Sequence, residues 1–349
     1  MARSIKKGSV VVAVGTKKGG FLFHSPDRKK WSVAGPFMEG GAVYHMILDP
    51  RDGRTVYASA PMGSEPWGPA IYRGRAEEEP KATQAFPKFK EGSDLSVSRI
   101  WHIEPGPSEA PDTIYAGAEP AALFRSDDRG DTWHDLGSLN YHPTRKEWQP
   151  GGGGLCLHSV LVDPRNARHL IVGISAVGAF ETRDGGRSWT MENRGVRAEF
   201  LPNKYPEWGQ CVHKLAWDAS GDGSLFQQNH CGTYHRGPDG GEWTEVTKAC
   251  RPISDFQSPC IQGRSTPRSW RRWSALGTAC SRKGRWPSGR RRTGAKRGDV
   301  PRRVCPARAL TLGFSGKEWP SMRRIRSVST PGRTRGSSLR AATKANRGR

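Results

Sequence analysis

Cysteine is scarce in this chain, with only seven in 349 residues, and their number is odd. A disulfide-stapled scaffold is therefore excluded, because its cysteines would come in even numbers and close sets. The first 20 residues hold an apolar run of only about six residues, too short for a signal peptide. Long apolar runs that could span a membrane are also missing. These absences predict a soluble, cytoplasmic protein without a membrane partner.

Acidic residues are almost missing from the last part of the chain. Residues 249–349 carry 22 Arg and four Lys against Asp255, Asp299 and Glu318, whereas residues 1–248 carry 30 basic and 30 acidic side chains. The formal net charge of +23 therefore belongs to the last part alone. No apolar period of 2 or 3.6 runs through it, which is typical of low-complexity sequence. We expect one folded domain over 1–248 and a disordered basic tail over 249–349.

The tail has the composition of GC-rich DNA translated in the wrong frame. New codons can be built from the third base of one residue and the first two bases of the next. One permitted reading of residues 327–348 then contains Val-Tyr-Ala-Gly-Thr and, further on, Leu-Phe-Ala-Ser-Ser-Asp-Glu-Gly-Glu-Ser-Trp. This is the outline of residues 113–133. We therefore expect a frameshift near Lys248. The alternative is a natural Arg-rich tail that binds RNA or DNA without sequence preference, and we expect no specific nucleic-acid partner.

The first 248 residues contain a repeated turn motif. SDDRGDTW spans 126–133 and TRDGGRSW spans 182–189, and shortened copies end at Trp31 and Trp243. The steps from one Trp to the next are 102, 56 and 54 residues, so the first step covers two repeats. About five repeats precede Lys248, and about seven would fit an intact frame.

Each repeat also has the same body of short strands. An apolar strand ends in an acidic or Pro turn, a second strand follows, and a third leads into the motif and a last strand after it. The first strands are expected at 44–50, 100–105, 157–164 and 212–218. Four short strands in a repeat of roughly 50 residues predict an all-β fold, a β-propeller of four-stranded blades. The first repeat starts with its second strand, residues 10–16, so we expect that strand to lack an inner partner and the ring to be open.

The residues of the turn have a structural role. The Asp carboxylate can accept backbone N–H groups, the Gly can take a positive φ, and the Trp can pack between blades. We assign this role to Asp27, Asp128, Gly130, Trp133, Asp184, Gly186, Trp189, Asp239 and Trp243.

The motif Ser/Thr-x-Asp-x-Gly-x-Ser/Thr-Trp resembles the Asp-box, or bacterial neuraminidase repeat. Residues 9–248 are similar to WD40/YVTN/BNR-like repeat proteins of the sialidase and sortilin superfamilies. The resemblance implies a propeller and leaves function open, because sialidases, xyloglucan hydrolases, photosystem assembly factors and sorting receptors all carry the repeat. Sialidases also start with Phe/Tyr-Arg-Ile-Pro, where this chain has FLFHSPD at 21–27. That departure argues against sialidase chemistry.

Histidines recur at similar places in the first strands of four repeats: His45, His102, His158 and His213. The first strand of a propeller blade lines the central channel, so we predict a polar, protonatable funnel there. Long loops at 144–158 and 193–213 would add binding groups. The alternative is that these histidines are buried between blades. The predicted ligand-binding residues are Trp101, His102, His158, Arg194, His213, Asn229 and His230.

Two classes of function remain open from the sequence. The first is a binding or scaffold module whose channel face takes a small polar ligand, a glycan or a partner protein. The second is an exo-sialidase-like glycoside hydrolase, which needs two carboxylates at a suitable separation. Glu104 and Glu119 are weak candidates for these carboxylates. No His-x-His or Cys-x-x-Cys spacing indicates a metal site, so we expect no metal and no cofactor.

Overall fold

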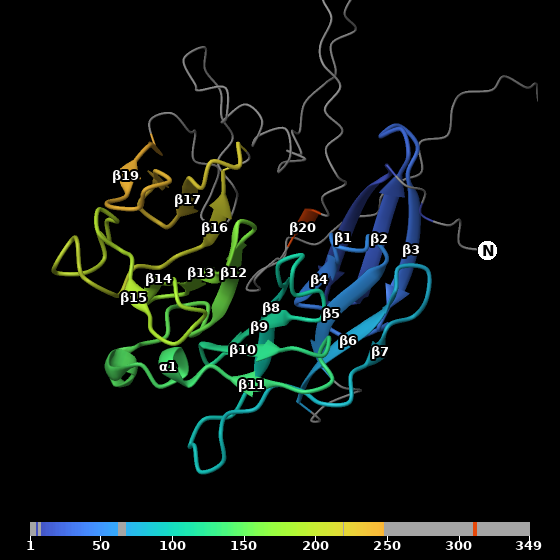
Figure 1. Cartoon of the computed structure of the whole chain (residues 1–349), viewed down its shortest axis with the longest axis horizontal. Coiled ribbons are helices and arrows are strands. Elements are labelled where there is room, and N and C mark those ends of the chain that lie inside the picture. The colour runs from blue at the N-terminus through green and yellow to red at the C-terminus, as the bar shows by residue number, and fades with distance from the viewer. Residues whose placement is uncertain (1–4, 6–7, 62–67, 219, 248–309, 313–349) are drawn as a thin grey trace, which may run out of the picture. The chain divides into compact units, whose positions relative to one another are not determined.

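The computed structural model describes residues 5, 8–61, 68–218, 220–247 and 310–312 (Figure 1). The predicted disorder of residues 249–349 falls outside the described residues, apart from 310–312. In the part of the chain that is described, no helix combines the length and apolar character that a membrane span requires.

The described residues form five four-stranded sheets, so the predicted all-β fold is confirmed. We number these blades 1 to 5 in chain order. Blade 1 contains β1 (Val10–Thr16), β2 (Gly19–Ser25) and β3 (Ser32–Phe37), with β20 (Leu310–Leu312) beside β1. Blade 2 contains β4 (His45–Leu48), β5 (Thr55–Pro61), β6 (Pro69–Arg75) and β7 (Lys81–Ala82).

Blades 3 to 5 follow the same order along the chain. Blade 3 contains β8 (Arg99–Pro105), β9 (Ile114–Glu119), β10 (Ala122–Ser126) and β11 (His134–Asp135). Helix α1 (Gly137–Asn140) and a 3-10 turn (Pro143–Glu147) lead to blade 4, which contains β12 (Leu157–Asp163), β13 (Asn166–Ile174), β14 (Gly178–Thr182) and β15 (Thr190–Met191). Blade 5 contains β16 (Lys214–Trp217), β17 (Leu225–Gln228), β18 (Thr233–Arg236) and β19 (Thr244–Glu245).

The first strands of consecutive blades contact one another, as in a β-propeller. Strand β4 contacts β8, β8 contacts β12, and β12 contacts β16. Small residues permit this approach: a Cβ added at Gly117 of β9 would clash with the carbonyl oxygen of Leu157 in the next blade, and one added at Gly15 would clash with Val43. A glycine in the second strand therefore fixes how closely the next blade packs.

Blade 1 differs from the expectation at its inner edge. We predicted that β1 would have no inner partner, but Val12–Val14 pairs with Leu310–Leu312 of β20. This pairing is parallel, whereas the other strand pairs of the five sheets are antiparallel. The unpaired N–H and C=O groups of an edge strand can accept any extended segment, which accounts for the difference.

The hydrophobic core lies between consecutive blades, and the Trp of the turn motif fills it. Trp133 packs against a cluster shared by blades 2 and 3, Trp189 belongs to one shared by blades 3 and 4, and Trp243 to one shared by blades 4 and 5. Each Trp thus packs against the blade that precedes its own. Trp31 of blade 1 is 46% exposed, and its neighbour Val33 is 54% exposed.

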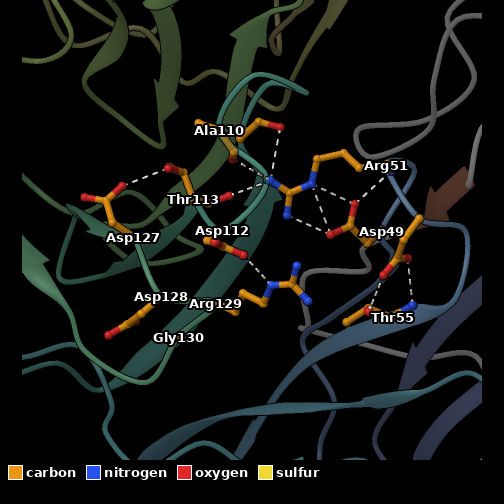
Figure 2. Close-up of polar contacts among 12 residues, drawn as sticks. Asp49, Arg51, Thr55, Ala110, Asp112, Thr113, Asp127, Asp128, Arg129 and Gly130 are labelled. Atoms are coloured by element: carbon orange, nitrogen blue, oxygen red, sulfur yellow. Dashed lines mark hydrogen bonds and ion pairs between the residues drawn. The ribbon is translucent and has the colours of Figure 1, made fainter.

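An arginine links blade 2 to blade 3 at the end of β4 (Figure 2). Arg51 binds both carboxylate oxygens of Asp49 through Nε and Nη2, and its Nη1 donates to the carbonyls of Ala110 (3.1 Å) and Thr113 (2.8 Å). Blade 4 repeats the arrangement, because Asp163 holds Arg165 and Arg165 donates to a carbonyl of blade 5. Both links share the sequence Asp-Pro-Arg, at 49–51 and 163–165.

Candidate functional site

The polar residues of the turn motif form hydrogen bonds within their own hairpins. Asp128 accepts the backbone N–H of Thr132 (2.8 Å) and its hydroxyl (2.6 Å), and Gly130, with φ of +99°, donates to the hydroxyl of Ser126 (2.7 Å). Burial opposes ionisation of Asp128, but the hydrogen bonds from Thr132 and Ser126 prevail and lower its pKa to about 2. Such a carboxylate stabilises the turn and is poorly suited to proton transfer.

The other turns vary this arrangement. Asp184 accepts the backbone N–H and the hydroxyl of Ser188, and Gly186 takes a φ of +90°. Asp27 accepts the N–H groups of residues 29 and 30, both at 2.8 Å. In blade 5 the turn is one residue shorter after Asp239, and Trp243 donates its indole N–H to the carbonyl of Glu192 in blade 4 (2.8 Å).

A cavity of about 200 Å³ opens beside the first strands of blades 2 to 5. Its lining carries nitrogen bases, two aromatic rings and two thiols, and none of its described lining residues is Asp or Glu. The nitrogen bases are His45, His102, His158, His213, Lys214 and His230. The aromatic rings belong to Tyr44 and Trp101, and the thiols to Cys156 and Cys211.

The strand register places the lining in two adjacent rows. His45, His102 and Lys214 face corresponding residues of their second strands, namely Ser59, Gly117 and Gln228. These three side chains therefore form one row across blades 2, 3 and 5.

A second row lies one residue earlier in each first strand. Trp101 and His158 sit where the register shifts by one residue in β8 and β12, and His213 directly precedes Lys214. The prediction that His45, His102, His158 and His213 occupy similar places was wrong in this detail. His158 and His213 belong to the second row, because Ser159 and Lys214 occupy the first-row positions of blades 4 and 5.

Trp101, which lines the cavity, is held in place by Glu119. Its indole N–H donates to Glu119 Oε2 (2.9 Å), which also accepts from Arg99 Nη1 (2.8 Å). The ring of Tyr44 lies 5.5 Å from that of Trp101, at 56°. Glu119, a candidate catalytic carboxylate from the sequence, is thus used to orient an aromatic side chain.

Glu104, the other candidate, is not among the residues that line the cavity, but it pairs with His102, which is. Their Oε2 and Nε2 atoms are 3.1 Å apart. Burial raises the pKa of Glu104 to about 8, although the charge of Lys214 opposes this. Burial, reinforced by Lys214 and His158, holds the pKa of His102 well below its usual range. Both shifts favour the uncharged forms, so a carboxyl group that donates to an imidazole nitrogen describes this pair at neutral pH.

Two predicted ligand-binding residues do not line the cavity. Asn229 accepts from the N–H groups of Cys231 (2.8 Å) and Gly232 (2.9 Å) and donates to the carbonyl of Arg197 (2.7 Å), so it stabilises its own turn. Arg194 lies near the last strand of blade 5, where its carbonyl accepts from the N–H of Trp243.

Three lining residues could hold a metal ion. Cys211, His213 and His230 each offer a ligand atom, and these atoms lie within 4.8 Å of one another. Sequence reasoning missed this set because His230 is distant in the chain, although Cys-x-His at 211–213 was visible.

No family model matches the chain, and no curated protein matches it by sequence. Among solved structures it is similar to the GH74 xyloglucanase from Xanthomonas campestris, at 17% identity and a TM-score of 0.46, covering 74% of this chain and 40% of that one. An ancestral GH74 enzyme shows 17% identity and a TM-score of 0.40, with 58% and 24% covered. YCF48 bound to D1 peptide shows 11% identity and a TM-score of 0.39, with 70% of each chain covered. The chain spans less than half the length of both GH74 structures.

Proposed function

We propose that this protein is a binding module that takes a small polar ligand, a sugar or a sugar acid, into the cavity at the first strands. The chemical character of the residues that line the cavity supports the proposal. The lining offers imidazoles, an ammonium group and aromatic faces, and none of its described residues is a carboxylate. A glycoside hydrolase would need two carboxylates beside the bound sugar.

The chemistry of the lining suits a sugar ring. Tyr44 and Trp101 offer apolar faces for the C–H groups of a pyranose, and Lys214 and the exposed His230 offer donors for hydroxyl or carboxylate oxygens. Aromatic surface continues outside the cavity on the loop 193–213. Phe200 is 53% exposed and meets the ring of His230 edge-on, with 6.0 Å between centroids. A ligand longer than one sugar could extend along it.

Calorimetric titration with a panel of neutral sugars and uronic acids tests this proposal. Trp101→Ala and Lys214→Met should each weaken the binding of a responding sugar, because both residues line the cavity. Trp31→Ala is the matched control, since Trp31 is an exposed Trp of blade 1 outside the lining. A sugar whose affinity none of the cavity variants changes would refute the proposed site.

One observation favours a glycoside hydrolase as the second candidate. Burial raises the pKa of Glu104 to about 8, and a general acid must keep its proton at neutral pH in this way. Chromogenic glycosides test the idea directly. Turnover that Glu104→Gln abolishes would establish the hydrolase; turnover lost on Glu119→Gln instead would identify the carboxylate that holds Trp101 as catalytic.

We further propose that the turns are Asp-boxes and that the reading frame is shifted after Lys248, so that the last blades are missing. The exposure of Trp31 supports this, because the Trp of blades 3, 4 and 5 each packs against a preceding blade. The parallel direction of the described β20–β1 pairing also supports it, because the other strand pairs of the described sheets are antiparallel. Sequencing the gene across codon 248 tests the frame: an extra or missing base is expected there, and an unbroken frame would refute the shift.

A further inference from the structure

We propose that Cys211, His213 and His230 bind a thiophilic divalent cation, Zn²⁺ above all, on the wall of the cavity. One thiolate and two imidazoles suit zinc and are poor ligands for Mg²⁺ and Ca²⁺, which prefer oxygen. The ligand atoms lie within 4.8 Å of one another, so small side-chain rotations bring them to one ion. The site lies in the same cavity as the proposed sugar site but does not depend on it.

The sheet topology of blade 5 brings the three residues together. Strands β16 and β17 are antiparallel, with Lys214 opposite Gln228. Residues just before β16 therefore lie beside residues just after β17, which places His213 next to His230. Their ring centroids are 4.2 Å apart and their planes nearly perpendicular.

Cys211 lies two residues before His213 in the segment that leads into β16. Both residues line the cavity. Val212 between them is buried in the cluster between blades 4 and 5, which anchors this segment. The backbone N–H of His213 also donates to the carbonyl of Gln228 at the end of β17, so the segment is held against the strand that precedes His230.

The three protein ligands favour a zinc site that keeps one coordination position open. Three protein ligands with a fourth position left for water or ligand are typical of reactive zinc sites, whereas structural sites use four. The open position would face the cavity that Trp101, His158 and Lys214 also line. A bound cation there would attract an anionic group of a ligand into the cavity.

Cobalt binding tests the site without any assay of activity. The full-length chain is used with its four cysteines after residue 248 changed to serine (Cys250, Cys260, Cys280 and Cys305), so that thiols outside the site cannot contribute. One equivalent of Co²⁺ should give the thiolate charge-transfer and ligand-field bands of a tetrahedral site, and Zn²⁺ should abolish them. Cys211→Ser should remove the charge-transfer band. His230→Gln should weaken cobalt binding by at least about 100-fold, since even the loss of an outer-shell partner costs up to that much.

Matched variants separate ligation from folding. Cys231→Ser changes the thiol next to His230 that lies outside the cluster, so the cobalt spectrum should persist. His230→Cys should retain binding, with a stronger charge-transfer band. His230 is exposed, so its variants decide the matter even where Cys211→Ser fails to fold. The absence of cobalt bands in the folded parent, or bands unchanged in His230→Gln, would overturn the proposal. Sugar binding is measured separately, so its failure would leave this result standing.

Discussion

The indole N–H of Trp101 donates to the carboxylate of Glu119, with 2.9 Å between Nε1 and Oε2. Glu119→Ala should therefore free the Trp101 ring and weaken sugar binding by about tenfold, the value of one hydrogen bond to a charged group. Calorimetric titration measures the change. Glu109→Ala, at an exposed turn residue of blade 3, is the control and should bind like the parent. Equal affinities in the parent and Glu119→Ala would show that Trp101 needs no such support.

The link between blades predicts unequal effects for two arginines. Arg51 and Asp49 are 10% and 6% exposed at their side chains, so Arg51→Ala leaves a buried carboxylate without its partner. Its unfolding free energy should fall by about 3 kcal/mol. Arg165 makes the corresponding bond to Asp163, but 51% of its side chain is exposed. Asp163 is buried as well, but His169 Nδ1 lies 2.8 Å from its Oδ2, so the carboxylate keeps a partner when Arg165 is removed. Arg165→Ala should therefore cost only about 1 kcal/mol. Denaturant titration measures both losses, and equal values would contradict this difference between the two carboxylates.

The free energy of unfolding should fall as the pH drops below about 6.5, because His158 is buried in its neutral form. Burial lowers its pKa to about 4, against the hydrogen bond that its ring makes with the carbonyl of Val212. The unfolded chain, with an ordinary His pKa of about 6.5, then binds more protons than the folded chain. Stability is therefore complete above about pH 6.5 and is lost as the pH falls towards 4. Denaturant titrations between these limits should show a shallower decline for His158→Gln; identical slopes in variant and parent would contradict it.

The sequence predicted the repeat, the strand order and the all-β fold, because strand length, turn chemistry and the Trp spacing are local properties. It could not separate the two rows of the cavity, because the bulges at Trp101 and His158 depend on pairing with the second strand. The Cys211, His213 and His230 set depends on the β16–β17 hairpin in the same way. The sequence also does not show that Asn229 stabilises a turn. Its side chain bonds the backbone of Arg197, Cys231 and Gly232, so the predicted role in ligand binding does not follow.

If the frame is shifted after Lys248 as we propose, restoring it should stabilise the protein. A complete last blade would cover Trp31 and Val33 and give β1 an antiparallel inner partner in place of the parallel one. The melting temperature of the restored chain should be higher, and it should aggregate less. Thermal unfolding with light scattering compares the two chains; the same melting temperature and the same aggregation would contradict the missing blades.

Polyanion binding should belong to the basic tail alone. Residues 249–349 carry the whole net charge, so the full chain should bind unrelated DNA and RNA sequences alike and lose affinity steeply with salt. Truncation after residue 248 should abolish this binding, because residues 1–248 are charge-balanced. Fluorescence anisotropy with two unrelated oligonucleotides measures it. Sequence-selective binding that resists salt would show that the tail is a natural nucleic-acid domain.

Fluorine NMR of the protein labelled with 5-fluorotryptophan tests the binding cavity most directly. A Trp→Phe substitution at each position assigns the resonances of Trp101, which lines the cavity, and Trp31, which is exposed on blade 1. Addition of a sugar or sugar acid that binds should shift the Trp101 resonance, saturate with the calorimetric affinity, and leave Trp31 unchanged. A bound sugar that shifts other tryptophans and leaves Trp101 unmoved would contradict the cavity as the ligand site.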